Sequence, residues 1–169
     1  MAGPFWIPTD TPGRLAILAR PRGGDWLPDD VGEWKRTGLR IVVSMLTAEE
    51  VADLDLVDEI GECERAGLNG IGFPVMDRGI PDDPLAFGEL AAELASDLAA
   101  GRSVGIHCRM GIGRSPLLAI AVLKTLGVPT AEAIRRSTAA RGRPVPETSE
   151  QVEWLHGFQP SAPAALEAV

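Results

Sequence analysis

The residues most suited to chemistry stand together in the segment His107-Cys108-Arg109-Met110-Gly111-Ile112-Gly113-Arg114-Ser115. The apolar run before the cysteine, residues 103–107, predicts a buried strand, and the apolar run from Ser115 to Leu126 predicts a helix. Residues 108–113 are then a loop between a strand and a helix N-terminus. Such a loop points successive backbone N–H groups inwards, where they can cradle a tetrahedral anion. We therefore predict an anion-binding loop made of Arg109, Met110, Gly111, Ile112, Gly113 and Arg114.

Two side chains of this loop predict its reactivity. The N–H groups and the helix dipole favour a thiolate over a thiol, so Cys108 is predicted to be a nucleophile at neutral pH. Arg114 enters the helix and can return its planar guanidinium to the anion as a bidentate donor. The spacing of cysteine and arginine alone is weak evidence, because chance supplies it in roughly one chain in six of this composition. Adding the preceding histidine, the two glycines and the following serine lowers that chance to on the order of one in a million.

The segment from His107 to Ser115 resembles the signature of the protein-tyrosine and dual-specificity phosphatase superfamily. This resemblance implies that Cys108 attacks phosphorus and forms a phosphocysteine while Arg114 binds the phosphate. It also implies that Ser115 stabilises the departing thiolate in the second step. His107 would then tune the cysteine through hydrogen bonds from behind the loop, although a simple core histidine at a strand end is the alternative interpretation.

A second resemblance to this family concerns the general acid. The segment Phe73-Pro74-Val75-Met76-Asp77 is similar to the one that carries the family's general acid upstream of the cysteine, and here the separation is 108 − 77 = 31 residues. Proton donation to the leaving group is required because an alkoxide or phenoxide leaves poorly. The resemblance implies this role for Asp77, while Asp82 and Asp83 are close enough in sequence to be alternatives.

A third resemblance lies after the loop. The segment Glu147-Thr148-Ser149-Glu150-Gln151 resembles the family loop in which two glutamines position the hydrolytic water. Gln151 matches the second glutamine, and the resemblance implies that it holds this water. Glu147 replaces the first glutamine by a carboxyl group, which leaves the efficiency of phosphoenzyme hydrolysis open.

The elements around these segments predict a single α/β domain with a central mixed, twisted sheet of about four to five strands flanked by helices. Strands are expected at residues 15–19, 39–46, 69–75 and 103–107, and helices at residues 29–36, 47–66, 85–100, 115–126, 130–141 and 148–158. The prolines between Pro4 and Pro12 indicate turns. We expect residues 1–159 to form the phosphatase domain and residues 160–169 a loose C-terminal tail.

Composition narrows the class of partner. The 169 residues carry a net charge of −8, which disfavours nucleic acid and anionic membranes as partners because both require a positive field. The start of the sequence lacks the pattern of a secretory signal, so a cytoplasmic location is expected. In that compartment Cys63 and Cys108 are expected to be free thiols. The histidines and cysteines lack a metal-ligand pattern, so we expect no metal and no cofactor, and a monomer.

The sequence leaves the substrate open. The resemblance favours phosphotyrosine in proteins, with phosphoserine and phosphothreonine as further candidates, because no segment resembles the phosphotyrosine-recognition loop of the larger tyrosine-restricted enzymes. A phosphorylated metabolite, nucleotide or inositol phosphate is the first alternative, since the loop recognises phosphate and not the group behind it. A sulfurtransferase of the rhodanese type, and a non-catalytic module that binds phosphorylated partners, are the others.

Two further sets of residues have a structural and a functional interpretation. Cys63 is either a small buried hydrophobe or a redox partner of Cys108. The arginines that follow the predicted loop helix form either a solvated face or a docking rim for an anionic substrate. They are Arg135, Arg136, Arg141 and Arg143.

Overall fold

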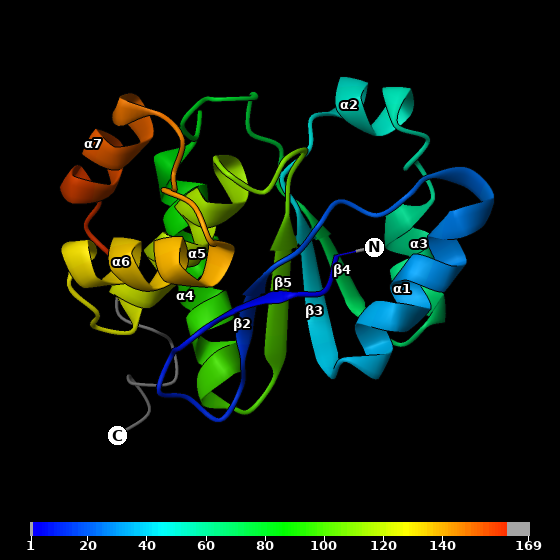
Figure 1. Cartoon of the computed structure of the whole chain (residues 1–169), viewed down its shortest axis with the longest axis horizontal. Helices are drawn as coiled ribbons and strands as arrows, with labels where there is room; N and C mark the ends of the chain where they lie inside the picture. Colours follow the sequence, from blue (N-terminus) through cyan, green and yellow to red (C-terminus); the bar gives the residue numbers. More distant parts are fainter. Residues whose placement is uncertain (1, 162–169) are drawn as a thin grey trace.

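The computed structural model describes residues 2–161 and contains a five-stranded sheet with helices on both faces (Figure 1). The strand order is β1-β2-β5-β3-β4, in which β1 is antiparallel to β2 and the other neighbours are parallel. The strands are β1 (Phe5–Ile7), β2 (Leu15–Ile17), β3 (Leu39–Ser44), β4 (Asn69–Gly72) and β5 (Ser103–His107). The predicted mixed α/β sheet is confirmed. Of the predicted tail, residues 162–169 lie outside the described residues.

The helices divide between the two faces of the sheet (Figure 1). One face carries η1 (Gly24–Trp26), α1 (Leu27–Arg36), α2 (Ala48–Asp53) and α3 (Glu59–Arg65). The other carries α4 (Pro84–Ala99), α5 (Arg114–Thr125), α6 (Thr130–Arg141) and α7 (Ser149–Gly157). Each face buries its own hydrophobic core, so the sheet is covered on both sides. None of the helices in residues 2–161 has the length and apolar character that crossing a bilayer requires.

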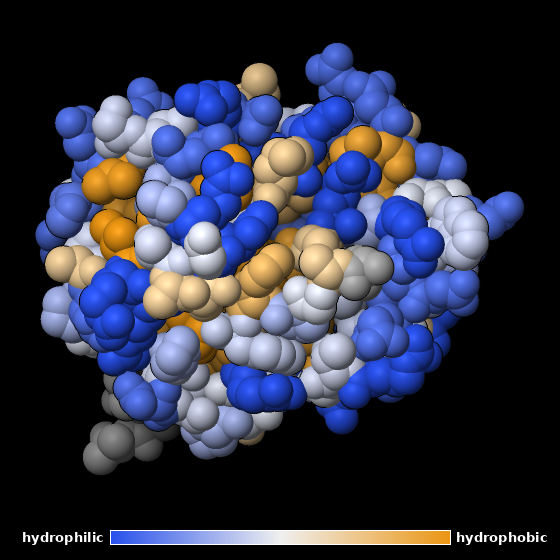
Figure 2. Space-filling model, viewed as in Figure 1, coloured by the Kyte–Doolittle hydropathy of each residue, from blue (hydrophilic) through white to orange (hydrophobic). Residues whose placement is uncertain are grey.

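The hydrophobic side chains are mostly enclosed by these two layers. Figure 2 shows hydrophilic residues over much of the viewed face, with hydrophobic residues in separate patches between them. The central helix α5 is buried along nearly its whole length, from Arg114 to Thr125. A helix that is apolar all round must be surrounded by other elements. Burial of α5 therefore fixes the position of the loop from which it starts.

The prediction of one helix over residues 47–66 is wrong. The capping box of Thr47 and Glu50 starts α2 as expected, but the helix ends at Asp53 and a new helix, α3, begins at Glu59. Asp55 adopts a left-handed backbone with φ 55°, and its carbonyl accepts a hydrogen bond of 3.1 Å from the N–H of Gly24. The apolar spacing that suggested a continuous helix included Val57, which is 70% exposed.

The predictions for the first turn and for the ends of the strands also need correction. The segment from Pro4 to Pro12 is not all turn, because Phe5–Ile7 pairs with β2 as an edge strand whose flanking prolines lie outside the paired residues. The strands predicted at 15–19, 39–46 and 69–75 end earlier, at Ile17, Ser44 and Gly72. The chain nevertheless stays close to its neighbours, since the Met45 N–H donates to the His107 carbonyl at 2.9 Å and the Val75 N–H donates to the Met45 carbonyl at 3.1 Å.

The parallel strands place four connections at one edge of the sheet. The carboxyl ends of β2, β5, β3 and β4 all meet there, along the upper edge in Figure 1. The loop containing Cys108 follows β5, and the segment containing Asp77 follows β4. In open α/β sheets, ligands bind outside the carboxyl ends of the strands. The topology thus gathers the predicted reactive segments.

Close packing between β2 and β5 generates a first prediction. A methyl group on Gly105 would lie 2.5 Å from Cδ1 and 2.8 Å from Cγ of Leu18, which is buried. Gly105→Ala is expected to lower the free energy of unfolding by about 1–3 kcal/mol, because an overpacked core must shift. Urea unfolding measures this change. The matched control is Gly72→Ala on β4, where nothing lies within 4 Å of the added methyl and the effect should stay within about 0.5 kcal/mol.

Candidate active site

The predicted anion-binding loop connects β5 to α5, which confirms the strand, loop and helix arrangement. The buried Cys108 Sγ accepts a 3.3 Å hydrogen bond from the N–H of Gly111 and lies 3.2 Å from the hydroxyl oxygen of Ser115. Gly111 has φ +72°, a backbone conformation that glycine adopts without strain. Donors directed at the sulfur stabilise a thiolate. The loop therefore has the geometry of an activated cysteine.

His107 lies behind this loop with both ring nitrogens engaged. Its Nε2 lies 2.5 Å from Oε1 of the buried Glu59, and its Nδ1 lies 3.3 Å from the carbonyl oxygen of Cys108. The ring stacks on Trp34 with the ring centroids 5.9 Å apart. These contacts fix the orientation of the histidine and connect it to the cysteine backbone, as expected of a residue that supports the loop.

Glu59 was missed by sequence reasoning. It begins α3 and its side chain points into the core, where its carboxylate contacts His107. The sequence contains a signal for Glu59, because Leu56, Glu59 and Cys63 follow the spacing of one helical face. The structure buries all three residues. A carboxylate on a face that is otherwise apolar needs a partner.

Arg114 is held by a second carboxylate that sequence reasoning assigned only to helix capping. The arginine is 1% exposed, and Glu50 accepts from its Nη1 at 2.7 Å and from its Nη2 at 2.9 Å. The Val75 carbonyl accepts a further 2.9 Å hydrogen bond from Nη1. The bidentate contact with Arg114 lowers the pKa of Glu50 to about 2. Glu50 also accepts from the Thr47 N–H at 2.9 Å, so one carboxylate caps α2 and positions Arg114.

Of the three candidates for the general acid, Asp77 is the one that contacts Arg114. Its Oδ1 accepts from Nη2 of Arg114 at 3.3 Å, and its side chain remains 59% exposed. Asp83 instead caps α4 by accepting from the N–H of Ala86 at 3.0 Å, and Asp82 is exposed. The geometry favours Asp77 over both alternatives, because Asp77 stands beside the group expected to bind phosphate.

Glu147 and Gln151 lie between the Cys108 loop and the Asp77 segment. A methyl group on Gly113 would lie 2.8 Å from Oε1 of Glu147 and 3.2 Å from Nε2 of Gln151. Gln151 is buried and donates to the Gly79 carbonyl at 3.0 Å, while Glu147 pairs with Arg78 at 3.1 Å. Both side chains therefore contact the turn that follows Asp77 as well as the loop. The role of Gln151 in holding the hydrolytic water stays a prediction.

The two cysteines are separate in the structure. Both are free, as expected. Cys63 belongs to the core beneath α1 and α3, whereas Cys108 belongs to the core on the opposite face. Burial raises the pKa of Cys63 to about 12, which disfavours the thiolate form of this residue. Cys63 thus acts as a small core residue.

The arginines after α5 differ in their contacts. Arg135 and Arg136 pair with Glu132 on α6 at 2.7 Å and 3.0 Å. Arg141 instead donates to the Gly111 carbonyl at 3.0 Å and to the Met110 carbonyl at 3.2 Å. It braces the outside of the Cys108 loop.

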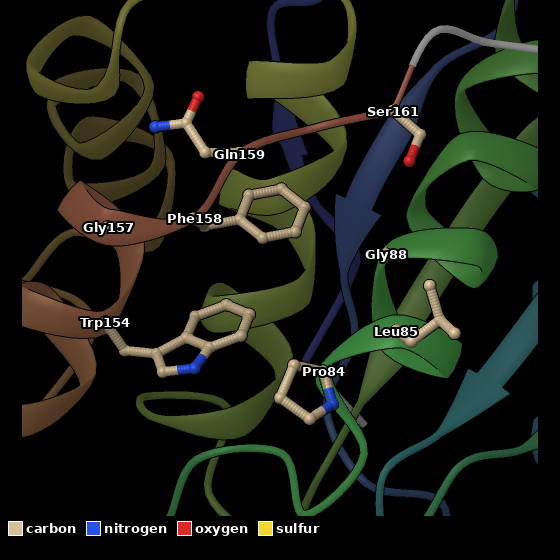
Figure 3. Close-up of a pocket in the computed structure, with 8 residues that line it drawn as sticks. All are labelled: Pro84, Leu85, Gly88, Trp154, Gly157, Phe158, Gln159 and Ser161. Carbon is tan, nitrogen blue, oxygen red and sulfur yellow. The ribbon is translucent and has the colours of Figure 1, made fainter.

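A groove of about 420 Å³ between α4 and α7 is distinct from this site (Figure 3). It is lined by Pro84, Leu85, Gly88, Trp154, Gly157, Phe158, Gln159 and Ser161. Trp154 stacks on Phe158 at 5.3 Å and meets Phe87 edge-on at 5.2 Å, so these aromatic rings belong to the packing of α7. None of the lining side chains is titratable, and the groove offers no acid, base or nucleophile.

The side chains of the described residues do not form a metal-binding group. Within residues 2–161, no three His, Cys, Asp or Glu side chains are grouped so that they could hold a metal ion. The chemistry available at the sheet edge is that of a cysteine nucleophile, an arginine anchor and a neighbouring carboxyl group.

A cysteine in a loop between strand and helix, with an arginine returning from the helix, defines the class of the protein-tyrosine and dual-specificity phosphatases. Comparison with known families specifies the relationship further. The family described as cyclin-dependent kinase inhibitor 3 (CDKN3) matches residues 25–134, and this chain belongs to that family.

The relatives agree with this assignment. Cyclin-dependent kinase inhibitor 3 of Rattus norvegicus is 30% identical over 139 residues, which cover 81% of this chain and 65% of the rat protein. The chain thus spans about 65% of the length of that relative. The solved structure of kinase associated phosphatase, with its catalytic-site cysteine substituted by serine, has a TM-score of 0.84 at 24% identity and covers 99% of this chain and 97% of its own, which establishes the fold. The structure of Tk-PTP in the active form has a TM-score of 0.70 at 26% identity, covering 93% and 97%.

The contact between Glu50 and Arg114 generates a second prediction. Glu50→Gln is expected to lower the free energy of unfolding at pH 7 by about 1–3 kcal/mol, because a buried guanidinium loses its charged partner. The pKa of Glu50 falls from 4.5 to about 2 on folding, so this stabilisation is complete above pH 4.5 and is lost as the pH falls towards 2. Urea unfolding at pH 7 and pH 3 should show a smaller difference between the variant and the unaltered protein at pH 3.

Glu49→Gln is the matched control, because Glu49 is exposed in the same helical turn. Its effect should stay within about 0.5 kcal/mol at either pH. An equal effect of Glu49→Gln and Glu50→Gln would contradict the specific role given to Glu50.

Proposed function

We propose that this chain is a cysteine-dependent protein phosphatase that hydrolyses phosphotyrosine, and phosphoserine or phosphothreonine as well, through a phosphocysteine. The observation that carries the proposal is the convergence of three groups at one sheet edge. Cys108 Sγ receives the Gly111 N–H, and Arg114 is anchored by Glu50 while it contacts Asp77. Family membership supports the same class of chemistry.

In the first step the Cys108 thiolate attacks phosphorus. The S–P bond forms as the bond between phosphorus and the substrate oxygen breaks, and the loop N–H groups stabilise the equatorial oxygens. Glu50 occupies one edge of the Arg114 guanidinium, formed by Nη1 and Nη2. The other edge, formed by Nε and Nη2, is the one that can bind phosphate bidentately, and Asp77 contacts Nη2.

Asp77 is proposed to protonate the leaving oxygen in the same step. Its position beside Nη2 of Arg114 places the carboxyl group next to the bound phosphate. Its exposure lets it meet the leaving group of a substrate that enters from solvent. General-acid catalysis of this kind contributes about 100- to 10,000-fold.

In the second step water attacks the phosphocysteine, phosphate is released and the thiolate is restored. Ser115, 3.2 Å from the sulfur, is placed to donate a hydrogen bond from its hydroxyl group to the leaving thiolate. Gln151 uses its amide oxygen in the α7 cap and one N–H on Gly79, which leaves one N–H for the water. Asp77, now ionised, takes the proton from that water.

A protein is the preferred substrate class. Relatives of this chain carry the name cyclin-dependent kinase inhibitor 3, and the exposed side chain of Asp77 is accessible to a residue on a protein surface. A small phosphorylated metabolite or inositol phosphate is the alternative substrate.

We also propose that the enzyme is cytoplasmic and monomeric. We propose that it requires no metal, since the nucleophile is a side chain.

Hydrolysis of p-nitrophenyl phosphate in EDTA tests the nucleophile. Cys108→Ser is expected to reduce kcat by about 1,000-fold or more, because a serine hydroxyl is a much weaker nucleophile than a cysteine sulfur. Cys63→Ala is the matched control and should retain activity, since Cys63 lies in the opposite core. Activity that survives in Cys108→Ser, or that disappears in EDTA, would contradict the proposal.

Asp77→Asn tests the general acid. On a phosphotyrosine peptide, kcat should fall by about 100-fold or more, with a smaller loss on p-nitrophenyl phosphate because its phenolate is the better leaving group. The loss of rate at the basic side of the pH profile should also disappear, since amides do not titrate. Asp82→Asn is the control and should behave as the unaltered protein does. If Asp77→Asn keeps the basic limb, the acid is another residue.

A further inference from the structure

Asp77 lies in a tight turn, residues 76–79, that we call the acid turn. The N–H of Gly79 donates to the Met76 carbonyl at 2.8 Å and closes this turn, so Asp77 and Arg78 are its two central residues. Arg78 has φ 62°, in the left-handed region that disfavours residues other than glycine. The position of the Asp77 carboxyl group therefore depends on contacts that hold the turn from outside.

Two side chains at the start of α7 make such contacts. Oε2 of Glu147 accepts from Nη1 of Arg78 at 3.1 Å, and Nε2 of Gln151 donates to the Gly79 carbonyl at 3.0 Å. Gln151 is buried and forms the capping box of α7 with Thr148, so the helix fixes its position. The acid turn is thus attached to α7 by an ion pair and a hydrogen bond.

Glu147 lies between the acid turn and the Cys108 loop. Its Oε2 takes part in the ion pair with Arg78, whereas its Oε1 lies 2.8 Å from where a methyl group on Gly113 would be. The Glu147 side chain is only 19% exposed. A carboxylate without a cation at this position would repel a phosphate bound in the loop. Arg78 supplies that cation and makes the carboxylate compatible with the site.

We propose that Arg78 and Glu147 are positioning residues for the general acid. Their ion pair holds the acid turn so that Oδ1 of Asp77 stays 3.3 Å from Nη2 of Arg114, and both residues act through Asp77. The inference rests on the proposed phosphatase function and adds two residues to its first step. It also gives a role to the carboxyl group of Glu147, which stands where the family loop has a glutamine.

Two aryl phosphates with different leaving groups test this inference. Phenyl phosphate needs a general acid because phenolate leaves poorly, whereas p-nitrophenyl phosphate needs the acid much less. The readout is the kcat/KM for p-nitrophenyl phosphate divided by the kcat/KM for phenyl phosphate. Arg78→Met and Glu147→Gln should each raise this ratio about 2- to 5-fold, the effect of losing one partly exposed ion pair. Because the ratio is measured within one variant, a general loss of folded protein does not change it.

Two further measurements separate positioning from a purely structural contribution. Arg78→Glu places two carboxylates together and should raise the ratio further, and adding Glu147→Arg should restore most of it, because the exchanged charges again attract. In an Asp77→Asn background, Arg78→Met should leave the ratio where Asp77→Asn alone puts it, since no acid remains to be positioned. A further rise in that background would contradict the inference.

Arg102→Met is the matched control. Arg102 forms an ion pair with Asp97 at 2.6 Å, and its side chain is 53% exposed, compared with 65% for Arg78. Arg102 precedes β5, at the end of this strand opposite Cys108. Its substitution should leave the ratio unchanged.

The outcomes distinguish this inference from the function on which it rests. If the unaltered protein hydrolyses neither aryl phosphate, the proposed function fails and the positioning role fails with it. If both are hydrolysed and neither Arg78→Met nor Glu147→Gln changes the ratio, the positioning role alone is overturned. An equal loss with both substrates also overturns it, because the ion pair would then serve phosphate binding or folding.

Discussion

The ion pair between Arg114 and Glu50 is the contact on which the site depends. It joins the start of α5 to α2, and the additional hydrogen bond from Arg114 to the Val75 carbonyl joins both to the segment after β4. A buried guanidinium without a partner would be strongly unfavourable. The ion pair therefore makes the arginine compatible with the core and leaves its Nη2 also in contact with Asp77.

A second carboxylate supports the loop from behind. Glu59 holds His107, which in turn contacts the backbone of Cys108. Residues 50 and 59 are nine positions apart, and in one continuous helix they would point about 180° from each other. The interruption between α2 and α3 removes this constraint, so that Glu50 reaches Arg114 and Glu59 reaches His107. The break that the apolar spacing did not predict is thus part of how the site is assembled.

Much of the site was predictable because its information is local. A strand, a glycine-bearing loop and a helix N-terminus follow one another within a few residues, and their backbone geometry specifies an anion cradle. The strand beginning at Phe5 was not predictable from its neighbours, because prolines indicate turns and only pairing with β2 makes this segment a strand. The same limit applies to Arg141, whose sequence context is a surface helix and whose contacts are with the Cys108 loop.

The sequence by itself determined the α/β class, the position of the reactive cysteine and its arginine, and the segment that carries Asp77. These follow from apolar periodicity, glycine placement and the chemistry of side chains at fixed spacing. Only the tertiary structure decided which carboxylates face which cations, since Glu50 and Glu59 come from two helices of the β3–β4 connection and Asp77 comes from the segment after β4. Contacts between segments distant in sequence have no local signature, because burial and partner choice depend on how the layers pack.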